Sequence, residues 1–512
     1  MPAAILSGIL TALAFPKAGL SFLAWISLIP LLLVLTGKRR RSGFLTAGLA
    51  GFVFNGILLY WIPDVPAHYG GMPYWLCILI YLALILFLAL YWGLFGHVFV
   101  RLHRTFPLAA FLVAPFLWIA TEFILTRFLT GFPWGIVGTS QYRNLPLIQT
   151  ASLAGVTGVS FLLVLVQSTF VLAVRRKPKS PFFAALALLA LAHAWGGYVL
   201  KKGDFRGPTG VKAAVVQGNV SSDIYWQFTA PGEVRGIFED HLDLTRQALD
   251  AGAELVIWPE FTVPLCWSCG EPLYKEFGAE VDRLVASSRA TLVLGSNEVT
   301  GPRANPQYHN TAMAIHPDLT RSLYYKMHLV PFGEYTPYKK VFFFIERVTH
   351  AIGDITPGSD HVLHKHAAFR FGSPICYEVI FPSLVRKFVR NGADFLVTIT
   401  NDGWYGKTSA PHQHWAQAVV RAVENRRYLL RAATTGVSGF VDPFGRVLAS
   451  SRLMTRAVLT ETVYPSARLS LYTRIGDALP VAGLTLSLFA LILAVLKNAK
   501  DRNTHGPHRQ II

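Results

Sequence analysis

Cys376 is the residue in this sequence that is best placed to act as a nucleophile. It follows a largely apolar run, residues 369–375, that predicts a short buried strand, and Tyr377 and Glu378 come directly after it. A cysteine attacks as its thiolate and therefore needs a base and a nearby positive charge. Without them, Cys376 would be an inert thiol that fills space in a protein core. The base and the cation must come from other parts of the chain.

Two other predicted strand ends carry an acid and an amine. Glu260 ends the sequence Ile-Trp-Pro-Glu, and Lys326 is the central residue of Tyr-Tyr-Lys-Met-His. Glu260 could take the thiol proton, Lys326 could stabilise an oxyanion, and Cys376 could attack a carbonyl carbon. Taken singly, Glu260 could be a helix cap, Lys326 a surface charge and Cys376 a core residue. Together they are the groups that acyl transfer through a thioester requires.

The composition indicates a membrane protein. The 512 residues are 52% hydrophobic with a mean hydropathy of +0.40, which is too apolar for an ordinary soluble chain. The net charge of +18 does not favour nucleic-acid binding, because the basic residues form short clusters between apolar runs. Eight apolar segments are candidates to span a bilayer, the first being marginal in length. They cover residues 3–15, 20–35, 44–62, 74–100, 106–125, 150–174, 181–200 and 478–496.

The basic residues favour one set of loops over the other. One set carries clusters within residues 38–41, 101–104 and 175–179, whereas the alternate set carries only Lys17, Arg127 and Arg143. By the positive-inside rule, both termini are cytoplasmic and the long polar region is outside. The first segment lacks a basic start, so we expect it to be retained rather than cleaved. The expected domains are a seven-span membrane domain, an extracytoplasmic catalytic domain and a final span with a basic cytoplasmic tail, over residues 1–200, 201–475 and 476–512.

From residue 211 the pattern changes to short apolar runs that alternate with amphipathic stretches. Such alternation predicts an α/β domain with a largely buried sheet. The expected strands are residues 211–216, 254–258, 291–295, 311–316, 369–375 and 395–400, with a hairpin over 436–450. The expected helices are residues 233–251, 275–289 and 414–431.

The sequence resembles the apolipoprotein N-acyltransferase family, a membrane-bound branch of the nitrilase superfamily. Glu260, Lys326 and Cys376 occur in this order within Trp-Pro-Glu, Tyr-x-Lys-x-His-Leu-Val-Pro-Phe-Gly-Glu-Tyr and Cys-Tyr-Glu. The resemblance covers nearly the whole chain. It includes the motifs Gly-Phe-Pro-Trp, Gln-Gly-Asn and Asn-Asp-Gly-Trp at residues 131–134, 217–219 and 401–404.

The resemblance implies an αββα sandwich beside a multi-span α-helical membrane domain, with Glu260 as base, Lys326 as charge stabiliser and Cys376 as nucleophile. The implied reaction moves a fatty acyl chain from a phospholipid, through a thioester, to the α-amine of the diacylglyceryl-cysteine of an apolipoprotein. The resemblance also implies that the catalytic domain lies on the periplasmic side of a bacterial inner membrane. The further residues that the resemblance assigns are Glu334, Tyr377 and Glu378 as supporting groups and Trp226, Trp404 and Asn310 as substrate-binding groups. We expect a monomer with no cofactor, metal or nucleic-acid partner.

Residues 339–347 place basic residues beside three consecutive phenylalanines. This composition is typical of an amphipathic arm that enters the membrane interface and contacts acyl chains, with Phe343 at its centre. A core helix of the catalytic domain explains the same pattern equally well.

Glu122 lies within an apolar segment, where a carboxylate is costly and therefore a candidate functional group. Pairing with Arg127 near the outer end of the span is the alternative. After Glu260, the family's usual small-residue turn is replaced by Phe261 and a Cys-Trp-Ser-Cys insertion at residues 266–269. A zinc site there is disfavoured because no second ligand pair is nearby, which leaves a local disulfide or two free thiols.

Two other functions remain open from the sequence. A nitrilase-like amidohydrolase could use the apolar segments only as an anchor, although seven segments before the domain exceed what anchoring needs. A transporter or lipid-binding scaffold could carry an inert domain, which the joint presence of Glu260, Lys326 and Cys376 disfavours. A serine lipase is disfavoured because the chain has no Gly-x-Ser-x-Gly sequence.

Overall fold

The computed structural model describes residues 1–176, 178–203, 207, 209–220, 231–270, 272–336 and 355–504. The chain divides into two compact units. The first unit comprises Met1–Tyr60, Leu79–Lys201 and Asp477–Ile512, and the second comprises Trp61–Ile78 and Lys202–Gly476. The second unit thus includes Trp61–Ile78, which in sequence lies between two segments of the first unit.

Five helices among the described residues are long and apolar enough to cross a membrane. They are α5 (Tyr74–Thr105), α6 (Pro107–Leu125), α9 (Val156–Arg176), α10 (Ser180–Lys202) and α17 (Ala478–Thr504). The first three expected segments form α1 (Pro2–Leu13), α2 (Ile29–Leu35) and α3 (Arg40–Leu58), which are not among these five. The chain therefore has a helical membrane unit, and its expected total of eight spans stays a prediction.

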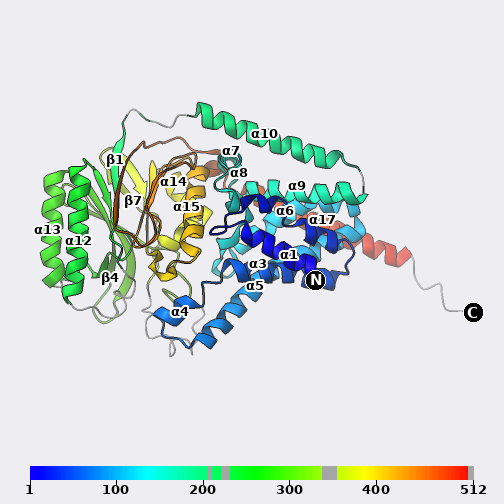
Figure 1. The fold of residues 1–512 in the computed structure, drawn as a ribbon, viewed down its shortest axis with the longest axis horizontal. Helices are drawn as coiled ribbons and strands as arrows, with labels where there is room; N and C mark the ends of the chain where they lie inside the picture. The colour runs from blue at the N-terminus through cyan, green and yellow to red at the C-terminus, as the bar shows by residue number, and fades with distance from the viewer. Residues whose placement is uncertain are drawn as a thin grey trace, which may run out of the picture. The chain divides into compact units, whose positions relative to one another are not determined.

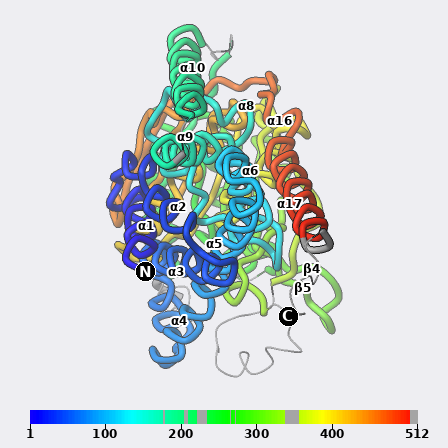
Figure 2. Tube along the Cα trace, turned by 90° about the vertical axis from the view of Figure 1, so that its right-hand side faces the viewer, coloured from blue at the N-terminus to red at the C-terminus, as the bar shows by residue number. Residues whose placement is uncertain are grey.

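Close helix packing holds the membrane unit together. Helix α6 packs against α9 and α17, and α1 packs against α3 (Figure 2). Glycines allow the backbones to approach: a Cβ at Gly8 would lie 2.5 Å from the carbonyl oxygen of Ala50, and one at Gly96 would lie 2.5 Å from that of Gly43. Small residues at helix crossings are typical of membrane bundles, where packing replaces the hydrophobic effect.

The second unit contains two β-sheets between two pairs of helices (Figure 1). Helices α12 (Pro231–Asp250) and α13 (Pro272–Ser288) cover one sheet, and α14 (Pro382–Arg390) and α15 (Ala410–Asn425) lie beside the other. Parallel pairing links the central strands of each sheet, and antiparallel strands complete the edges. This arrangement is a nitrilase-like α/β fold with the expected αββα layers.

The first sheet has the order β13-β1-β2-β4-β5-β6, with β3 paired to β4, and the second has the order β12-β11-β10-β9-β8-β7. The strands of the first sheet are β1 (Val211–Gln217), β2 (Leu255–Ile257), β3 (Val263–Cys266), β4 (Thr291–Thr300), β5 (Gln307–Ile315), β6 (Arg321–Tyr325) and β13 (Ala457–Val463). Those of the second are β7 (Leu363–His366), β8 (Phe369–Gly372), β9 (Phe395–Thr400), β10 (Leu429–Ala433), β11 (Gly439–Val441) and β12 (Val447–Ser450).

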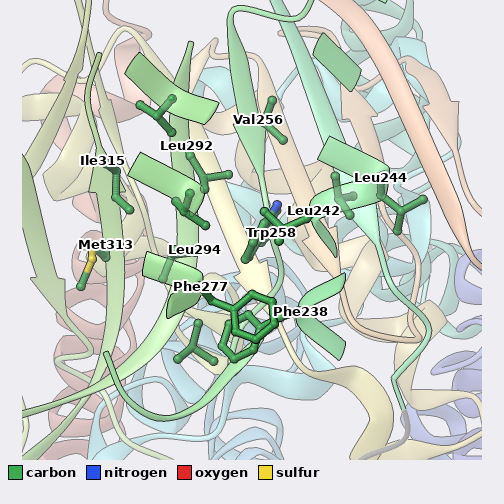
Figure 3. Close-up of a cluster of buried hydrophobic side chains, with 14 of the residues drawn as sticks. Phe238, Leu242, Leu244, Val256, Trp258, Phe277, Leu292, Leu294, Met313 and Ile315 are labelled. Carbon is green, nitrogen blue, oxygen red and sulfur yellow. The ribbon is translucent and has the colours of Figure 1, made fainter. Parts of the chain in front are cut away.

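A hydrophobic core joins α12 and α13 to the first sheet (Figure 3). Phe238 of α12 stacks on Phe277 of α13 with ring centroids 4.6 Å apart. Trp258, at the end of β2, is fully buried and donates its indole N–H to Thr245 Oγ1 at 2.8 Å. Since a buried indole needs an acceptor, this bond lets Trp258 fill the core two residues before Glu260.

Most of the expected elements form, and two of them end earlier than expected. Strand β9 and the β11–β12 hairpin lie where expected, but the helix expected over residues 414–431 ends at Asn425. Arg426 adopts the left-handed conformation that ends the helix, and β10 then begins at Leu429. The strand expected over residues 369–375 stops at Gly372, before Pro374, which has no backbone N–H to donate.

Candidate active site

Cys376 occupies a strained turn between strand and helix. Ile375 still bridges Ile399 of β9, and Cys376 then begins the 3₁₀ helix η5 (Cys376–Ile380) with φ at +50°. A positive φ is uncommon for a residue with a side chain and marks a position that the surrounding fold enforces. The thiol is buried, since Cys376 is only 4% exposed.

The acid and the amine meet in a buried cluster. Lys326 directly follows β6, and its Nζ lies 3.1 Å from Glu260 Oε1 and 2.8 Å from Glu334 Oε1. Asn310 of β5 joins the same two carboxylates, because its Nδ2 donates to each at 2.8 Å. Glu260 Oε2 accepts the backbone N–H of Asn401 at 2.7 Å. One ammonium and one amide therefore hold two carboxylates in fixed positions.

The position of Glu260 depends on a glycine in the neighbouring strand. A Cβ added to Gly295 of β4 would lie 2.5 Å from Glu260 Cα and 2.5 Å from the carbonyl oxygen of Pro259. The backbone N–H of Gly295 donates to that same oxygen at 3.1 Å. The turn that carries Glu260 can therefore pack on β4 only because this position has no side chain.

The electrostatics of the cluster keep Lys326 charged and the thiol protonated. Burial alone would lower the pKa of Lys326, but the carboxylates of Glu260 and Glu334 raise it above its ordinary value. Burial and the negative charge of Glu260 raise the pKa of the Cys376 thiol well above its ordinary value, and the charge of Lys326 offsets part of this shift. Attack by sulfur in this site therefore requires that a base remove the thiol proton.

Glu378 connects the turn at Cys376 to the residues that follow Lys326. One of its oxygens accepts the backbone N–H groups of Met327 and His328 at 2.7 and 3.0 Å, and the other accepts that of Ile375 at 2.7 Å. The hydroxyl of Tyr324 lies 2.8 and 2.9 Å from the two oxygens. The pKa of Glu378 is raised to about 7 because of burial, although the hydrogen bonds from Ile375, His328 and Tyr324 offset part of that effect. Glu378 thus links the residue before Cys376 to residues on both sides of Lys326.

A second buried network, which the sequence did not predict, holds the backbone of Cys376. His414 of α15 lies with Nε2 3.1 Å from the carbonyl oxygen of Cys376 and Nδ1 2.9 Å from both Asp402 Oδ1 and an Arg431 nitrogen. The Cys376 carbonyl oxygen can only accept, so His414 Nε2 carries a proton and donates it there. Burial and the charge of Arg431 lower the pKa of His414, whereas Asp402 raises it. Arg431 also pairs with Asp402 at 2.8 Å.

The two parts of the sequence match two family models. Residues 7–169 match the apolipoprotein N-acyltransferase N-terminal domain, and residues 212–468 match the carbon-nitrogen hydrolase family. The apolipoprotein N-acyltransferase of Geobacter metallireducens is 36% identical, with 93% of this chain and 91% of the relative aligned. The chain belongs to the apolipoprotein N-acyltransferase family. It is a membrane-embedded enzyme of lipoprotein biosynthesis whose substrates are a lipid and a lipoprotein.

A second relative and a solved structure are also similar to this chain. The apolipoprotein N-acyltransferase of Azotobacter vinelandii is 32% identical over 98% of this chain and 96% of its own length. Among solved structures, Saccharomyces cerevisiae Nit3, a member of the nitrilase superfamily, aligns with a TM-score of 0.40 at 20% identity. That alignment covers 54% of this chain and 97% of Nit3.

Tyr377 and Trp404, which the resemblance also assigned, contact other aromatic residues. Tyr377 is buried next to His328 and Phe381, with ring centroids 5.8 and 5.2 Å away. Trp404 lies in η6 (Asp402–Tyr405), and its ring centroid is 4.8 Å from that of Tyr69. Trp226 and Phe343 lie outside the described residues, as does the segment 339–347.

The structure decides between the alternatives for the cysteine pair and excludes one alternative for Glu122. Cys266 and Cys269 form a disulfide, and no group of at least three His, Cys, Asp or Glu side chains among the described residues could hold a metal ion. Arg127 does not pair with Glu122; it lies 2.5 Å from Asp477 instead. Glu122 therefore needs another explanation within its apolipoprotein N-acyltransferase membrane domain.

Proposed function

We propose that this enzyme transfers a fatty acyl chain from a phospholipid to the α-amine of a diacylglyceryl-cysteine, through a thioester on Cys376. The buried contact between Lys326 and Glu260 is the observation that carries this proposal, because both groups also act electrostatically on the Cys376 thiol. A base, a fixed positive charge and a thiol are thereby available to one substrate carbonyl.

In the first half-reaction, Glu260 takes the thiol proton as Cys376 Sγ bonds to the carbonyl carbon of a phospholipid ester. The carbonyl π electrons move to oxygen, where the ammonium of Lys326 and a backbone N–H near Tyr377 stabilise the negative charge. Each such donor is worth about 3 kcal/mol in comparable sites. The intermediate then collapses to the thioester, and the departing lysophospholipid oxygen takes the proton from Glu260.

In the second half-reaction, the α-amine of the lipoprotein attacks the thioester carbon. Glu260 accepts a proton from the attacking nitrogen, and Lys326 again stabilises the oxyanion. The carbon–sulfur bond breaks, the sulfur regains its proton from Glu260, and the amide leaves. The enzyme returns to its starting protonation state, and the amide is too stable to revert.

The burial of the cluster favours transfer to an amine over hydrolysis. Lys326, Glu260 and Asn310 are each 1% exposed, and Cys376 is 4% exposed. A thioester in such a site meets few water molecules before the acceptor arrives. The carboxylate of Glu334 keeps Lys326 charged throughout, since its oxygen lies 2.8 Å from Nζ.

The same proposal includes the arrangement in the membrane. Eight spans would put the catalytic domain, residues 201–475, on the periplasmic side of a bacterial inner membrane, with residues 1–200 and 476–512 providing the spans. The clusters of basic residues at 38–41 and 175–179 support cytoplasmic loops at those positions. Both lipid substrates could then reach a monomeric enzyme without leaving the bilayer.

Purified full-length enzyme, a phospholipid and a synthetic diacylglyceryl peptide test this function. We expect N-acylated peptide and lysophospholipid in equal amounts, and neither from Cys376→Ser. Release of free fatty acid without acylated peptide would instead identify a hydrolase. Product from the Cys376→Ser variant at the rate of the unmodified enzyme would exclude the thioester route.

A further inference from the structure

Two buried side chains hold the backbone around Cys376. Glu378 accepts the N–H of Ile375, the residue before it, at 2.7 Å. His414 Nε2 lies 3.1 Å from the carbonyl oxygen of Cys376 itself and donates to it. Cys376 has φ at +50°, a conformation that persists only where the surrounding fold enforces it. Side-chain hydrogen bonds on both sides of Cys376 therefore help to enforce its conformation.

Further hydrogen bonds fix the ring of His414 in this orientation. The residue belongs to α15 and is fully buried, and its other ring nitrogen, Nδ1, lies 2.9 Å from both Asp402 Oδ1 and an Arg431 nitrogen. Asp402 is fixed in turn by Arg431 at 2.8 Å and by the hydroxyl of Thr400 at 3.1 Å. Partners at one ring nitrogen orient the whole ring and so direct the other nitrogen. The N–H on Nε2 is thereby directed at the carbonyl of Cys376.

The bond from His414 also sets the direction of the next backbone N–H. The peptide between Cys376 and Tyr377 is trans and planar, so its carbonyl and its N–H point in opposite directions. Holding the carbonyl on His414 therefore turns the N–H of Tyr377 to the opposite side. This N–H lies in the first turn of η5, where helical N–H groups lack an intrahelical acceptor, and within the described residues it donates to no other group. It is a fixed donor that remains available.

The proposed acyl transfer needs a donor at this place. Attack by Cys376 Sγ on a carbonyl carbon leaves negative charge on the oxygen, and a donor stabilises that charge best when it is directed there before the reaction. The N–H of the residue after a nucleophile can serve in this way, because it lies close to an oxygen on the carbon that the nucleophile has attacked. In this chain that N–H belongs to Tyr377.

We propose that His414 is a positioning residue for acyl transfer, which holds the peptide after Cys376 so that the N–H of Tyr377 faces the oxyanion. Asp402 and Arg431 act one step further away, by fixing the ring. Nε2 already carries a proton, so His414 takes none from the thiol and touches no substrate atom. The inference rests on the proposed thioester route, because that route forms an oxyanion on a carbon bonded to Cys376.

Two reactions of Cys376 separate positioning from packing. Full-length protein in detergent is mixed with phospholipid, and acylation of the Cys376 peptide is followed by mass spectrometry. In parallel, the same protein reacts with iodoacetamide, which the sulfur attacks in one displacement step that forms no oxyanion. The variants are His414→Leu, which has no donor, and His414→Gln, whose amide N–H can replace that of Nε2. His316→Gln is the matched control, because His316 bonds Ser322, at 3.2 Å, and not Cys376.

We expect His414→Leu to form the acyl-enzyme about 10²-fold more slowly than the unmodified protein, as for loss of one oxyanion donor. Its rate of alkylation by iodoacetamide should be unchanged, since that reaction does not use the N–H of Tyr377. His414→Gln should recover most of the acylation rate, because it restores the donor to the carbonyl. His316→Gln should match the unmodified protein in both reactions.

Three outcomes would overturn the inference. The first is acylation of His414→Leu at the unmodified rate. The second is an equal loss of both reactions in His414→Leu, or a His414→Gln enzyme that is as slow as His414→Leu at an unchanged melting temperature, which would show that His414 only maintains packing. The third is an unmodified protein that iodoacetamide alkylates at Cys376 but phospholipid never acylates. In that case the thioester route itself fails, and the role of His414 fails with it.

Discussion

Lys326 Nζ lies 3.1 Å from Glu260 Oε1, and both side chains are almost completely buried. The two residues are far apart in sequence, and they meet because β2 and β6 belong to one sheet. Breaking a buried ion pair leaves an uncompensated charge, so each partner constrains the other. The contact keeps a carboxylate and an ammonium side by side, as the proposed roles of Glu260 as base and Lys326 as charge stabiliser require.

Glu260→Gln should abolish acyl transfer, because an amide cannot accept the thiol proton. All three contacts of the Glu260 oxygens come from donors, so the NH₂ of glutamine must also face one of them. We expect kcat/KM for peptide acylation to fall by about 10²- to 10⁴-fold. Glu276→Gln changes an exposed carboxylate and should leave the rate unchanged. A Glu260→Gln enzyme with more than a tenth of the original rate would contradict a role as base.

The reactivity of Cys376 should keep increasing above pH 9. Burial and the charge of Glu260 raise the pKa of this thiol, so the thiolate fraction at neutral pH is lower than for a free cysteine and grows further as the pH rises. We expect the rate of iodoacetamide alkylation at the Cys376 peptide, measured by mass spectrometry, to show no plateau between pH 8 and 10. The same peptide in denatured protein should level off near a pKa of about 8.5. A plateau below pH 8 in the folded enzyme would disprove this shift.

Gly295→Ala should displace the turn that carries Glu260. The new Cβ would lie 2.5 Å from Glu260 Cα, and a shift of about 1 Å in a catalytic group can cost about 10²-fold in rate. The matched control is Gly236→Ala in α12, where an added Cβ meets no atom within 4 Å. We expect the control to retain its rate and melting temperature. Equal activity of the two variants would show that the close approach at Gly295 does not position Glu260.

Asp402→Asn should destabilise the catalytic unit. Asp402 and Arg431 are both fully buried, and removing one charge of such a pair costs about 3–5 kcal/mol. Burial would raise the pKa of Asp402, but Arg431 and His414 lower it below its ordinary value, so its stabilising effect persists at neutral pH and is lost only in acid. Thermal unfolding in detergent measures the loss, and Asp243→Asn, an exposed carboxylate, is the control. Similar melting temperatures for the two variants would argue against the network's structural role.

Sequence motifs predicted Glu260, Lys326 and Glu334 as site residues, but not their arrangement in one buried cluster. Glu260, Lys326 and Cys376 each follow an apolar run, and reactive residues collect where buried strands end. Asn310 was assigned to substrate binding by resemblance, whereas its amide lies between the carboxylates of Glu260 and Glu334. Which groups an amide contacts depends on the pairing of β5 with β4 and β6, and a local pattern does not contain that information.

The network that holds the carbonyl of Cys376 could not be predicted for a similar reason. Asp402, His414 and Arg431 come from η6, α15 and β10, and only the parallel pairing of β9 with β10 brings them to one place. The apolar pattern after His414 continues through Arg431, so it favoured one long helix. The left-handed conformation of Arg426 interrupts that helix, and an arginine gives no local signal for it.

The acyl-enzyme is the most direct test of the central claim. Full-length protein is incubated with phospholipid alone, and its Cys376 peptide is analysed by mass spectrometry. We predict that one fatty acyl group is attached to Cys376, that neutral hydroxylamine removes it, and that a diacylglyceryl peptide discharges it to give the N-acylated product. Formation of that product by an enzyme whose Cys376 never carries an acyl group would contradict the account.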